Sequence, residues 1–304
     1  MKNHQSLKLF KKMKNPILRS GLLMGFLLSA SMSFGQIQTP QASPAIKVTT
    51  TVGLTDVVLE YSRPGVKGRD RKIFGGLVPY GEVWRTGANA ATKVTFGDSV
   101  KIKDQWLPGG TYALYTIPEK GEWTVVFSRN TDLWGSMGYS ANDDALRVKI
   151  KPGNLTEPAE TFTIDFANYT TNGANMNIMW DFTKVSVPIE TEVDKKVMAQ
   201  IQKVMASPQE KSGPYYTAAN YYYRNGKDKN QALQWIDQAI AKDDRYFYQY
   251  LKALILTDLN RPKEAIQAAE KSKAGAQKEK NPEYVKMNDE LIARLNKNQS
   301  NRKK

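Results

Sequence analysis

Between Ile46 and Pro188, apolar and polar residues alternate with a period of two. This period is typical of strands that bury one face. The run Thr55, Val57, Leu59 and Tyr61 shows it most clearly, because a polar or smaller residue separates each pair. The other runs with this pattern are 94–96, 100–102, 112–116, 123–127, 146–150, 162–166 and 176–180.

Turn-forming residues separate these runs at intervals of about 8–12 residues. Examples are Pro108-Gly109-Gly110, Lys151-Pro152-Gly153-Asn154 and Thr171-Asn172-Gly173. Many short strands between such turns favour an antiparallel β-sandwich or jelly roll. The sequence therefore predicts one β-domain over residues 36–190, which is long enough to bury its own core.

After Pro188 the apolar period changes to that of a helix. Val193, Val197, Ile201 and Val204 predict a first helix that ends near Ser207-Pro208. Five more helices are expected at 215–223, 232–241, 246–256, 265–273 and 284–295. The fold class is thus β plus α, with a short helical array over residues 191–304.

Two helical segments of this array align at a spacing of 33 residues, with Ala232 over Ala265 and Ile236 over Ala269. The spacing resembles tetratricopeptide repeats, whose period is about 34 residues. Such arrays present an extended surface to peptides, so a protein or peptide partner is expected there. Tyr215, Tyr216 and the run 221–223 are expected to pack between repeats, or to line a peptide-binding groove.

The first 35 residues have the pattern of a secretory signal peptide. Six lysines and arginines up to Arg19 precede an apolar run from Ser20 to Phe34. That run is shorter than the ~20 residues needed to span a bilayer. We expect cleavage before Gln36 and a periplasmic or secreted protein with no membrane span, exported by a Gram-negative bacterium.

Cleavage would leave a chain without histidine or cysteine, because His4 is the one histidine and cysteine is absent. Ser-His-Asp and Cys-His catalysis, zinc sites built on these residues and disulfides are then excluded. We predict no cofactor and no metal. The net charge becomes +8, with 38 Lys and Arg against 30 acidic residues. Most of this charge lies in residues 261–304, and nucleic acid is not an expected partner.

The stretch 61–92 combines four arginines and two lysines with six glycines. Planar cations beside conformationally free glycines suggest loops that contact a ligand. The candidate ligand-binding residues are Arg63, Arg69, Glu82, Trp84, Arg85 and Asn89. The alternative is structural: Glu82 pairs with an arginine, Trp84 fills the core and the glycines form tight turns.

Asp143 and Asp144 form a second candidate, beside Trp134 and Tyr139. Oxygen ligands can hold calcium, but the EF-hand spacing is absent, which favours a polar loop tip. With Glu82, either aspartate would supply the two carboxyl groups of a glycosidase. The sequence does not show whether these acids approach each other.

The β-domain contains several long motifs, at 61–64, 67–69, 73–81, 83–89, 108–112 and 161–166. With these motifs, the chain resembles the bacterial family called domain of unknown function 2911 over about Ser43 to Glu190. The resemblance brings no established reaction or ligand.

Two hypotheses of different classes follow. The leading one is a non-enzymatic binding or assembly protein of the periplasm, with an anionic or carbohydrate ligand at the loops and a protein partner at the helices. The rival is a carboxylate-dependent glycan hydrolase. The chain combines two modules of kinds that usually bind ligands or proteins, which favours the first hypothesis. No catalytic residue is assigned.

Overall fold

The computed structural model describes residues 39–301, and the chain divides into two compact units. The first unit contains residues 39–50, 56–167 and 175–188. The second contains 51–55, 168–174 and the residues from 189 onward. The expected signal peptide lies outside the described residues.

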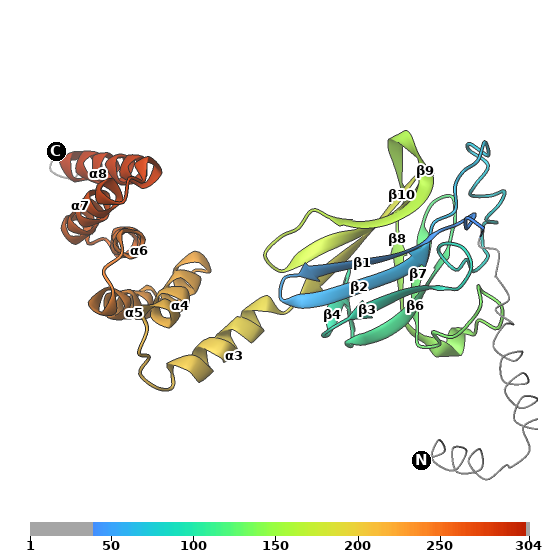
Figure 1. Ribbon diagram of the computed structural model, residues 1–304, viewed down its shortest axis with the longest axis horizontal. Coiled ribbons are helices and arrows are strands. Elements are labelled where there is room, and N and C mark those ends of the chain that lie inside the picture. Colours follow the sequence, from blue (N-terminus) through green and yellow to red (C-terminus); the bar gives the residue numbers. More distant parts are fainter. Residues whose placement is uncertain (1–38, 302–304) are drawn as a thin grey trace, which may run out of the picture. The chain divides into compact units, whose positions relative to one another are not determined.

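The first sheet of the first unit has six strands in the order β1-β2-β3-β6-β7-β8 (Figure 1). Antiparallel pairing places Val94 opposite both Leu59 and Tyr112. Four of the five steps across this sheet join strands that follow each other in the chain, through short turns after β1 and β6 and through longer segments after β2 and β7. The strands are β1 (Ala45–Val52), β2 (Thr55–Ser62), β3 (Thr92–Phe96), β6 (Gly110–Ile117), β7 (Trp123–Ser128) and β8 (Asp144–Ile150).

The second sheet has four strands in the order β5-β4-β10-β9. Its two long strands pair from Asn175 opposite Ala167 to Lys184 opposite Gly153. The register shifts on both sides of Asp181, and there β9 instead bridges Gly65 through Thr161. The strands are β4 (Val100–Ile102), β5 (Gln105–Leu107), β9 (Gly153–Ala167) and β10 (Gly173–Thr191).

The predicted alternation matches the buried face of β2, where Thr55, Val57, Leu59 and Tyr61 are all at most 5% exposed. The two sheets meet through the side chains of this face. Tyr61, for example, packs edge to face on Phe162 of the second sheet, 5.7 Å between ring centres. The predicted two-sheet antiparallel fold is therefore confirmed, as is the mixed β and α class.

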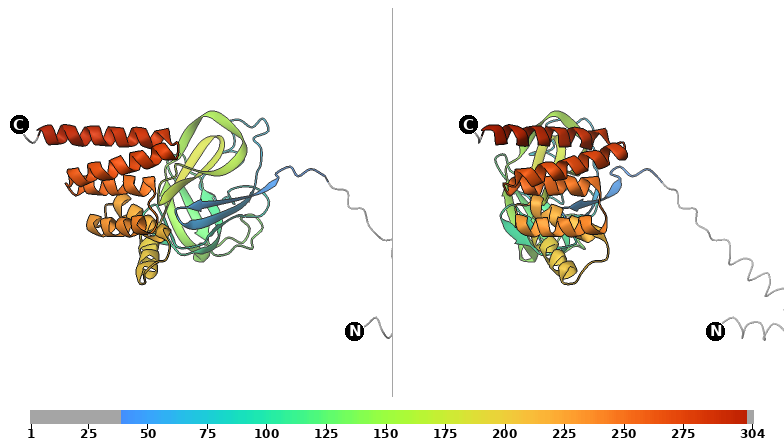
Figure 2. Two further views of the ribbon diagram at one scale, coloured as in Figure 1. Left: turned by 60° about the vertical axis from the view of Figure 1, so that its left-hand side comes forward. Right: turned by 90° about the vertical axis from the view of Figure 1, so that its left-hand side faces the viewer.

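Within the described residues, six α-helices follow the sheets, as the sequence predicted, each close to its expected position and mostly longer. Helices α4 to α8 pack against their neighbours in chain order and lie side by side (Figure 2). The aligned positions Ala232 and Ala265 are both fully buried, so the spacing of 33 residues marks equivalent packing sites. The helices are α3 (Val193–Met205), α4 (Ser212–Arg224), α5 (Lys229–Lys242), α6 (Tyr246–Asp258), α7 (Pro262–Lys278) and α8 (Pro282–Asn301).

Within residues 39–301, none of these helices has both the length and the apolar character needed to cross a bilayer.

Candidate functional site

The six candidate residues lie on the long segment that joins β2 to β3, and backbone pairing holds this segment at two places. Near its start, Val66 N–H donates to Glu160 O at 2.7 Å, and Phe162 N–H donates to Pro64 O at 2.8 Å. Further along, Trp84 and Thr116 exchange two backbone hydrogen bonds of 2.8 and 2.9 Å. The segment is therefore fixed to both sheets.

Arg63 and Arg69 direct their guanidinium groups to nearby protein oxygens. Arg63 donates from Nε to Phe162 O at 3.1 Å and from Nη2 to Thr163 Oγ1 at 2.8 Å. Arg69 donates from Nη2 to Gly65 O at 2.8 Å, and its buried Nε has no partner within the described residues. These contacts give both arginines a role in shaping the loop, and a ligand role for them stays a prediction.

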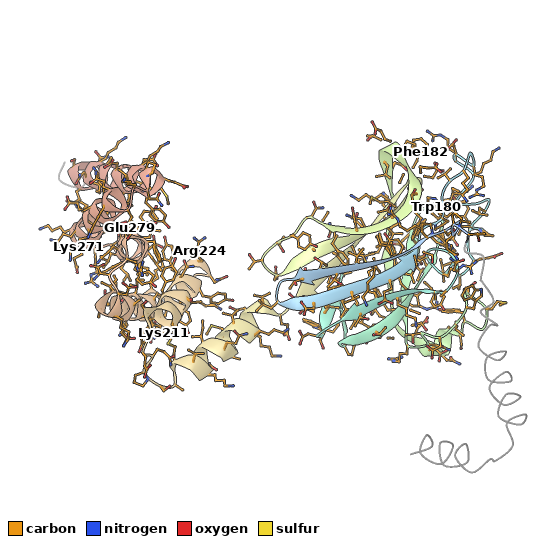
Figure 3. The ribbon with its side chains drawn as sticks, viewed as in Figure 1. Trp180, Phe182, Lys211, Arg224, Lys271 and Glu279 are labelled. Carbon is orange, nitrogen blue, oxygen red and sulfur yellow. The ribbon has the colours of Figure 1, made fainter. Side chains whose placement is uncertain are left out.

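The neighbouring Arg71 ties the loop to β10 at the register shift. Its backbone N–H donates to Asp181 Oδ2 at 2.7 Å, and its guanidinium lies 4.0 Å from the centre of the Phe182 ring. Figure 3 shows Phe182 on β10 close to Trp180. Asp181 is 4% exposed, and a buried carboxylate that accepts a backbone donor anchors the loop at that position.

Trp84 packs into an aromatic cluster, as the structural alternative expects. It stacks on Trp180 with ring centres 5.8 Å apart and meets Phe162 edge to face at 5.3 Å. Phe74, from the same loop, lies 4.7 Å from Trp123. These rings fill the space between the sheets, so this part of the loop closes the open end of the sandwich.

Arg85 and Asn89 lie beside each other at the end of the loop. Arg85 donates from Nη1 to Asn89 O at 2.9 Å. Asn89 has a left-handed backbone (φ 61°), and its Nδ2 donates to Ser43 O and Ser62 Oγ, both at 3.3 Å. Glu82 is exposed, and we find no hydrogen bond or ion pair from it to any residue in the described part of the chain.

A second loop, residues 129–143, lies against Arg85. A Cβ added to Gly135, at φ +72°, would approach Arg85 Nη1 to 2.5 Å. Tyr115 donates its hydroxyl to Gly135 O at 3.2 Å. The fold thus brings together two segments that the sequence analysis treated separately.

The acids of this second loop are held by hydrogen bonds. Asp144 Oδ2 accepts from the Tyr139 hydroxyl at 2.8 Å and from Arg147 Nε at 2.5 Å. Burial, followed by the hydrogen bond to Asp144, raises the pKa of Tyr139 to about 12. Asp143 accepts from Asn130 Nδ2 at 3.4 Å. Among residues 39–301, no cluster of three or more acids, histidines or cysteines has the arrangement of a metal site.

Beneath the second loop, four buried residues in or next to the first sheet form a second, minor core. The buried members are Ala91, Ala113, Tyr115 and Val126, with Val83, Leu133 and Tyr139 packed on them. In contrast to these covered residues, Trp134 and Met137 of the same loop are 63% and 74% exposed. The loop therefore presents two large apolar side chains on a firmly attached base.

A hollow of about 460 Å³ borders this minor core at the ends of β1, β2 and β3. Its charged lining consists of Lys47, Glu60 and Lys93. The remaining lining residues are Ala45, Ile46, Tyr61, Ser62, Ala90 and Ala91. Small side chains leave the space open, and Ser62 connects it to Asn89 by the hydrogen bond given above.

The two lysines of the hollow have weak partners. Lys47 pairs with Glu60 at 2.7 Å, and Lys93 approaches Asp132 of the second loop at 3.9 Å. The four side chains are 37–91% exposed, and ion pairs of this kind contribute about 0–1 kcal/mol. Neither lysine is therefore held strongly by its acidic partner.

The sequence analysis missed both lysines because they lie on strands, outside the arginine-rich stretch. A signal was present, since Lys47 and Lys93 each interrupt an otherwise uncharged strand. Only the pairing of β1 with β2 and of β2 with β3 brings them to one hollow.

Two antiparallel sheets followed by six helices define a two-module β and α protein. Within it, residues 43–189 match the family model described as "Protein of unknown function (DUF2911)". This match supports the resemblance seen in the sequence over nearly the same residues. A comparison with curated proteins and one with solved structures gave no match.

Proposed function

We propose that this protein is a non-enzymatic binding or assembly protein of the periplasm. Its first unit would hold an anionic carbohydrate at the hollow, and its helices would contact a protein partner. The observation that carries the proposal is the hollow itself, with Lys47 and Lys93 in weak ion pairs and the Arg85–Asn89 turn beside it.

A carbohydrate suits the surroundings of this hollow. Lysine and arginine donate to carboxylate or sulfate groups, and an aromatic ring can stack on the apolar face of a sugar. Trp134, 63% exposed, is next to Gly135, which touches Arg85. The Trp134 ring and the Arg85 guanidinium are therefore available to a sugar at neighbouring positions on one edge of the first unit.

The hydrolase alternative gains no comparable support. It needs two carboxyl groups that face a substrate from opposite sides. Asp144 is bound by Tyr139 and Arg147, and its side chain is 7% exposed. Glu82 is exposed, and in the part of the chain that the structure describes no hydrogen bond or ion pair orients its carboxyl group.

A titration with oligogalacturonate tests the proposal, with an uncharged dextran oligosaccharide of the same size as control. We expect calorimetric binding of the acidic sugar only, weakened about tenfold or more when Lys47 and Lys93 are both changed to Ala, as loss of two charge-assisted contacts implies. Lys120→Ala, at an exposed turn outside the hollow, is the matched control.

The same samples separate the two hypotheses. Chromatography of the sugar after long incubation should recover it intact. Shortened products that disappear in the variant Glu82→Gln would favour the hydrolase. Equal binding by the wild-type protein and the double lysine variant would remove the hollow from the proposal.

For the second unit, the support is its repeated packing. Ala232 and Ala265, and likewise Ile236 and Ala269, occupy equivalent buried positions 33 residues apart. This favours tetratricopeptide-like stacking, and such stacks present their outer rows of side chains to other proteins.

Export is part of the proposal and has a direct test. N-terminal sequencing of the protein from a Gram-negative host should begin at Gln36, and the protein should leave with the periplasmic fraction. A sequence that begins at Met1 in the cytoplasmic fraction would contradict it.

A further inference from the structure

Tyrosine side chains of three alternate helices form one continuous surface on the second unit. The rings of Tyr246 and Tyr250 on α6 lie 4.9 and 5.5 Å from Tyr284 on α8. Tyr216 on α4 lies 5.4 Å from Phe247, which in turn contacts Tyr246 at 5.4 Å. We call Tyr216, Tyr223, Tyr246, Tyr250 and Tyr284 the tyrosine face; all five are partly exposed.

Most hydroxyl groups of the tyrosine face have no protein partner. Tyr246 accepts a hydrogen bond from Asn281 Nδ2 at 3.1 Å. For Tyr216, Tyr223, Tyr250 and Tyr284 we find no hydrogen bond of the hydroxyl to any residue between 39 and 301, and none of these oxygens is a buried orphan. They are thus open to a ligand.

These hydroxyls remain protonated at neutral pH. Burial is the main cause that raises the pKa of Tyr216, Tyr223, Tyr250 and Tyr284 above the ordinary value of 10.0. A neutral tyrosine hydroxyl donates one hydrogen bond, and the ring that carries it is flat and apolar. The face therefore combines four free donors with flat apolar surfaces.

Charged groups of both signs lie around the tyrosine face. Beyond burial, which is the main cause, Asp258 raises the pKa of Tyr223, whereas Arg294 and Arg224 lower it. Asp258 is held in an ion pair with Lys229 at 3.1 Å. In contrast, Arg224, at the C-terminal end of α4 (Figure 3), and Arg294 on α8 are exposed, and neither forms an ion pair with a described residue. Residues 191–304 hold 22 Lys and Arg against 14 acids, so the whole unit favours an anionic partner.

We infer that the tyrosine face binds an extended, proline-rich segment of a partner protein that carries acidic residues beside the prolines. This inference rests on the proposed role of the helices in contacting a protein. A polyproline II segment offers carbonyl acceptors with no internal hydrogen bonds, and its prolines lack N–H donors. The free tyrosine hydroxyls can donate to these carbonyl oxygens, and the tyrosine rings can pack on the proline rings. Aromatic-lined surfaces recognise the polyproline II conformation in this way. The exposed Arg224 and Arg294 would bind the acidic residues of this partner segment.

The test uses the full chain and a fluorescent peptide with two Pro-x-x-Pro motifs flanked by glutamates. Fluorescence anisotropy should show binding, at least tenfold tighter than to the peptide with Ala in place of every Pro. The double variant Tyr250→Phe, Tyr284→Phe removes two hydroxyls and keeps the rings. We expect it to weaken binding about tenfold, as the loss of two hydrogen bonds implies. Tyr80→Phe in the first unit is the matched control.

Several results would overturn the inference. If the Pro and Ala peptides bound equally well, the inferred preference for proline would be wrong, whereas the proposed protein contact at the helices would be kept. Unchanged affinity of the double Phe variant, with an unchanged circular dichroism melt, would place binding elsewhere. No binding by any peptide would also remove support for the proposed protein contact, whereas the hollow of the first unit is tested independently by the sugar titration.

Discussion

The two units differ in charge and in how they fill their interiors. Residues 36–190 carry 16 basic and 16 acidic residues, whereas residues 191–304 carry an excess of eight basic ones. The β unit fills its core with large side chains such as Trp123, Tyr115 and Phe127, all at most 2% exposed. The helical unit buries alanines between its helices.

This difference teaches where each unit can accept a ligand. The space between the two sheets is filled by aromatic rings together with valine, leucine and isoleucine, so the β unit keeps many of its aromatic residues inside and offers lysines at a hollow. Helices approach each other closely when alanines lie between them. Their larger side chains, tyrosines above all, then remain partly on the surface.

The largest expected effect comes from separating the units. Residues 36–190 should fold alone, and residues 191–304 should lose most of their cooperative unfolding. The helical fragment would lack the turn 51–55, where a Cβ on Gly53 would approach Thr191 Oγ1 to 2.3 Å and Val193 Cγ2 to 2.5 Å. Two repeats are also fewer than the three or so that a stable stack needs.

Circular dichroism melts of both fragments check this prediction. An aggregated β fragment beside a helical fragment that unfolds cooperatively would reverse which unit depends on the other.

Trp180→Ala should destabilise the β unit alone, by about 3–5 kcal/mol, because it leaves a cavity in the aromatic cluster. Trp180→Phe is the milder control, since the indole N–H is buried without a partner among the described residues and its loss costs no hydrogen bond. Urea unfolding is followed by helical circular dichroism for the helical unit and by tryptophan fluorescence for the β unit, which holds five of the six tryptophans; Trp235 on α5 is changed to Phe in every sample. Equal losses in both signals would contradict independent cores.

Ala269→Leu should act on the helical unit alone and cost about 1–3 kcal/mol, because three added carbon atoms must fit where the side chain is fully buried. If the two units have independent cores, the unfolding transition of the β unit should stay unchanged in the same urea experiment. Gln267→Leu, at an exposed position of α7, is the control and should change little.

The smallest effect concerns Asp194 in α3. Hydrogen bonds from Lys227 at 2.7 Å and Tyr221 at 2.8 Å, of which that from Lys227 contributes most, lower the pKa of its carboxyl below the ordinary 3.8. A lowered pKa means stabilisation that is present above pH 3.8 and is lost as the pH falls through the folded value.

Asp194→Asn should therefore lower the melting temperature slightly at pH 7, and the difference should shrink in 1 M salt because the pair is exposed. It should also shrink as the pH falls below 3.8 and through the lowered pKa of the folded state. A shift that persists at low pH would mean that the substitution acts through packing.

Much of the fold could be predicted from the sequence. The alternation of Val57, Leu59 and Tyr61 identified β2, and the change of period after Pro188 gave all six helices. Strand β1 was not identified as a run of its own, because it lies at a sheet edge and seven of its eight residues remain at least partly exposed. Strand β5 has no alternating signal, because its apolar residues Trp106 and Leu107 are adjacent and two of its three residues are exposed.

The candidate site was less predictable. Arg85 and Asn89 lie in one loop and are joined by a hydrogen bond, but the contact of Arg85 with Gly135 depends on how residues 129–143 cross the first sheet. Glu82 and Asp144 were considered together, and only the fold showed that Asp144 is bound by Tyr139 and Arg147.

The sequence by itself determined the two modules, their periods, the excess of positive charge after residue 190 and the absence of cysteine. These are properties of neighbouring residues or of composition. Only the tertiary structure decided that the arginine-rich loop closes the sandwich, that Lys47 and Lys93 share a hollow, and that five tyrosines from three helices form one face. Such sites join residues far apart in the chain, and strand order and helix packing set their distances.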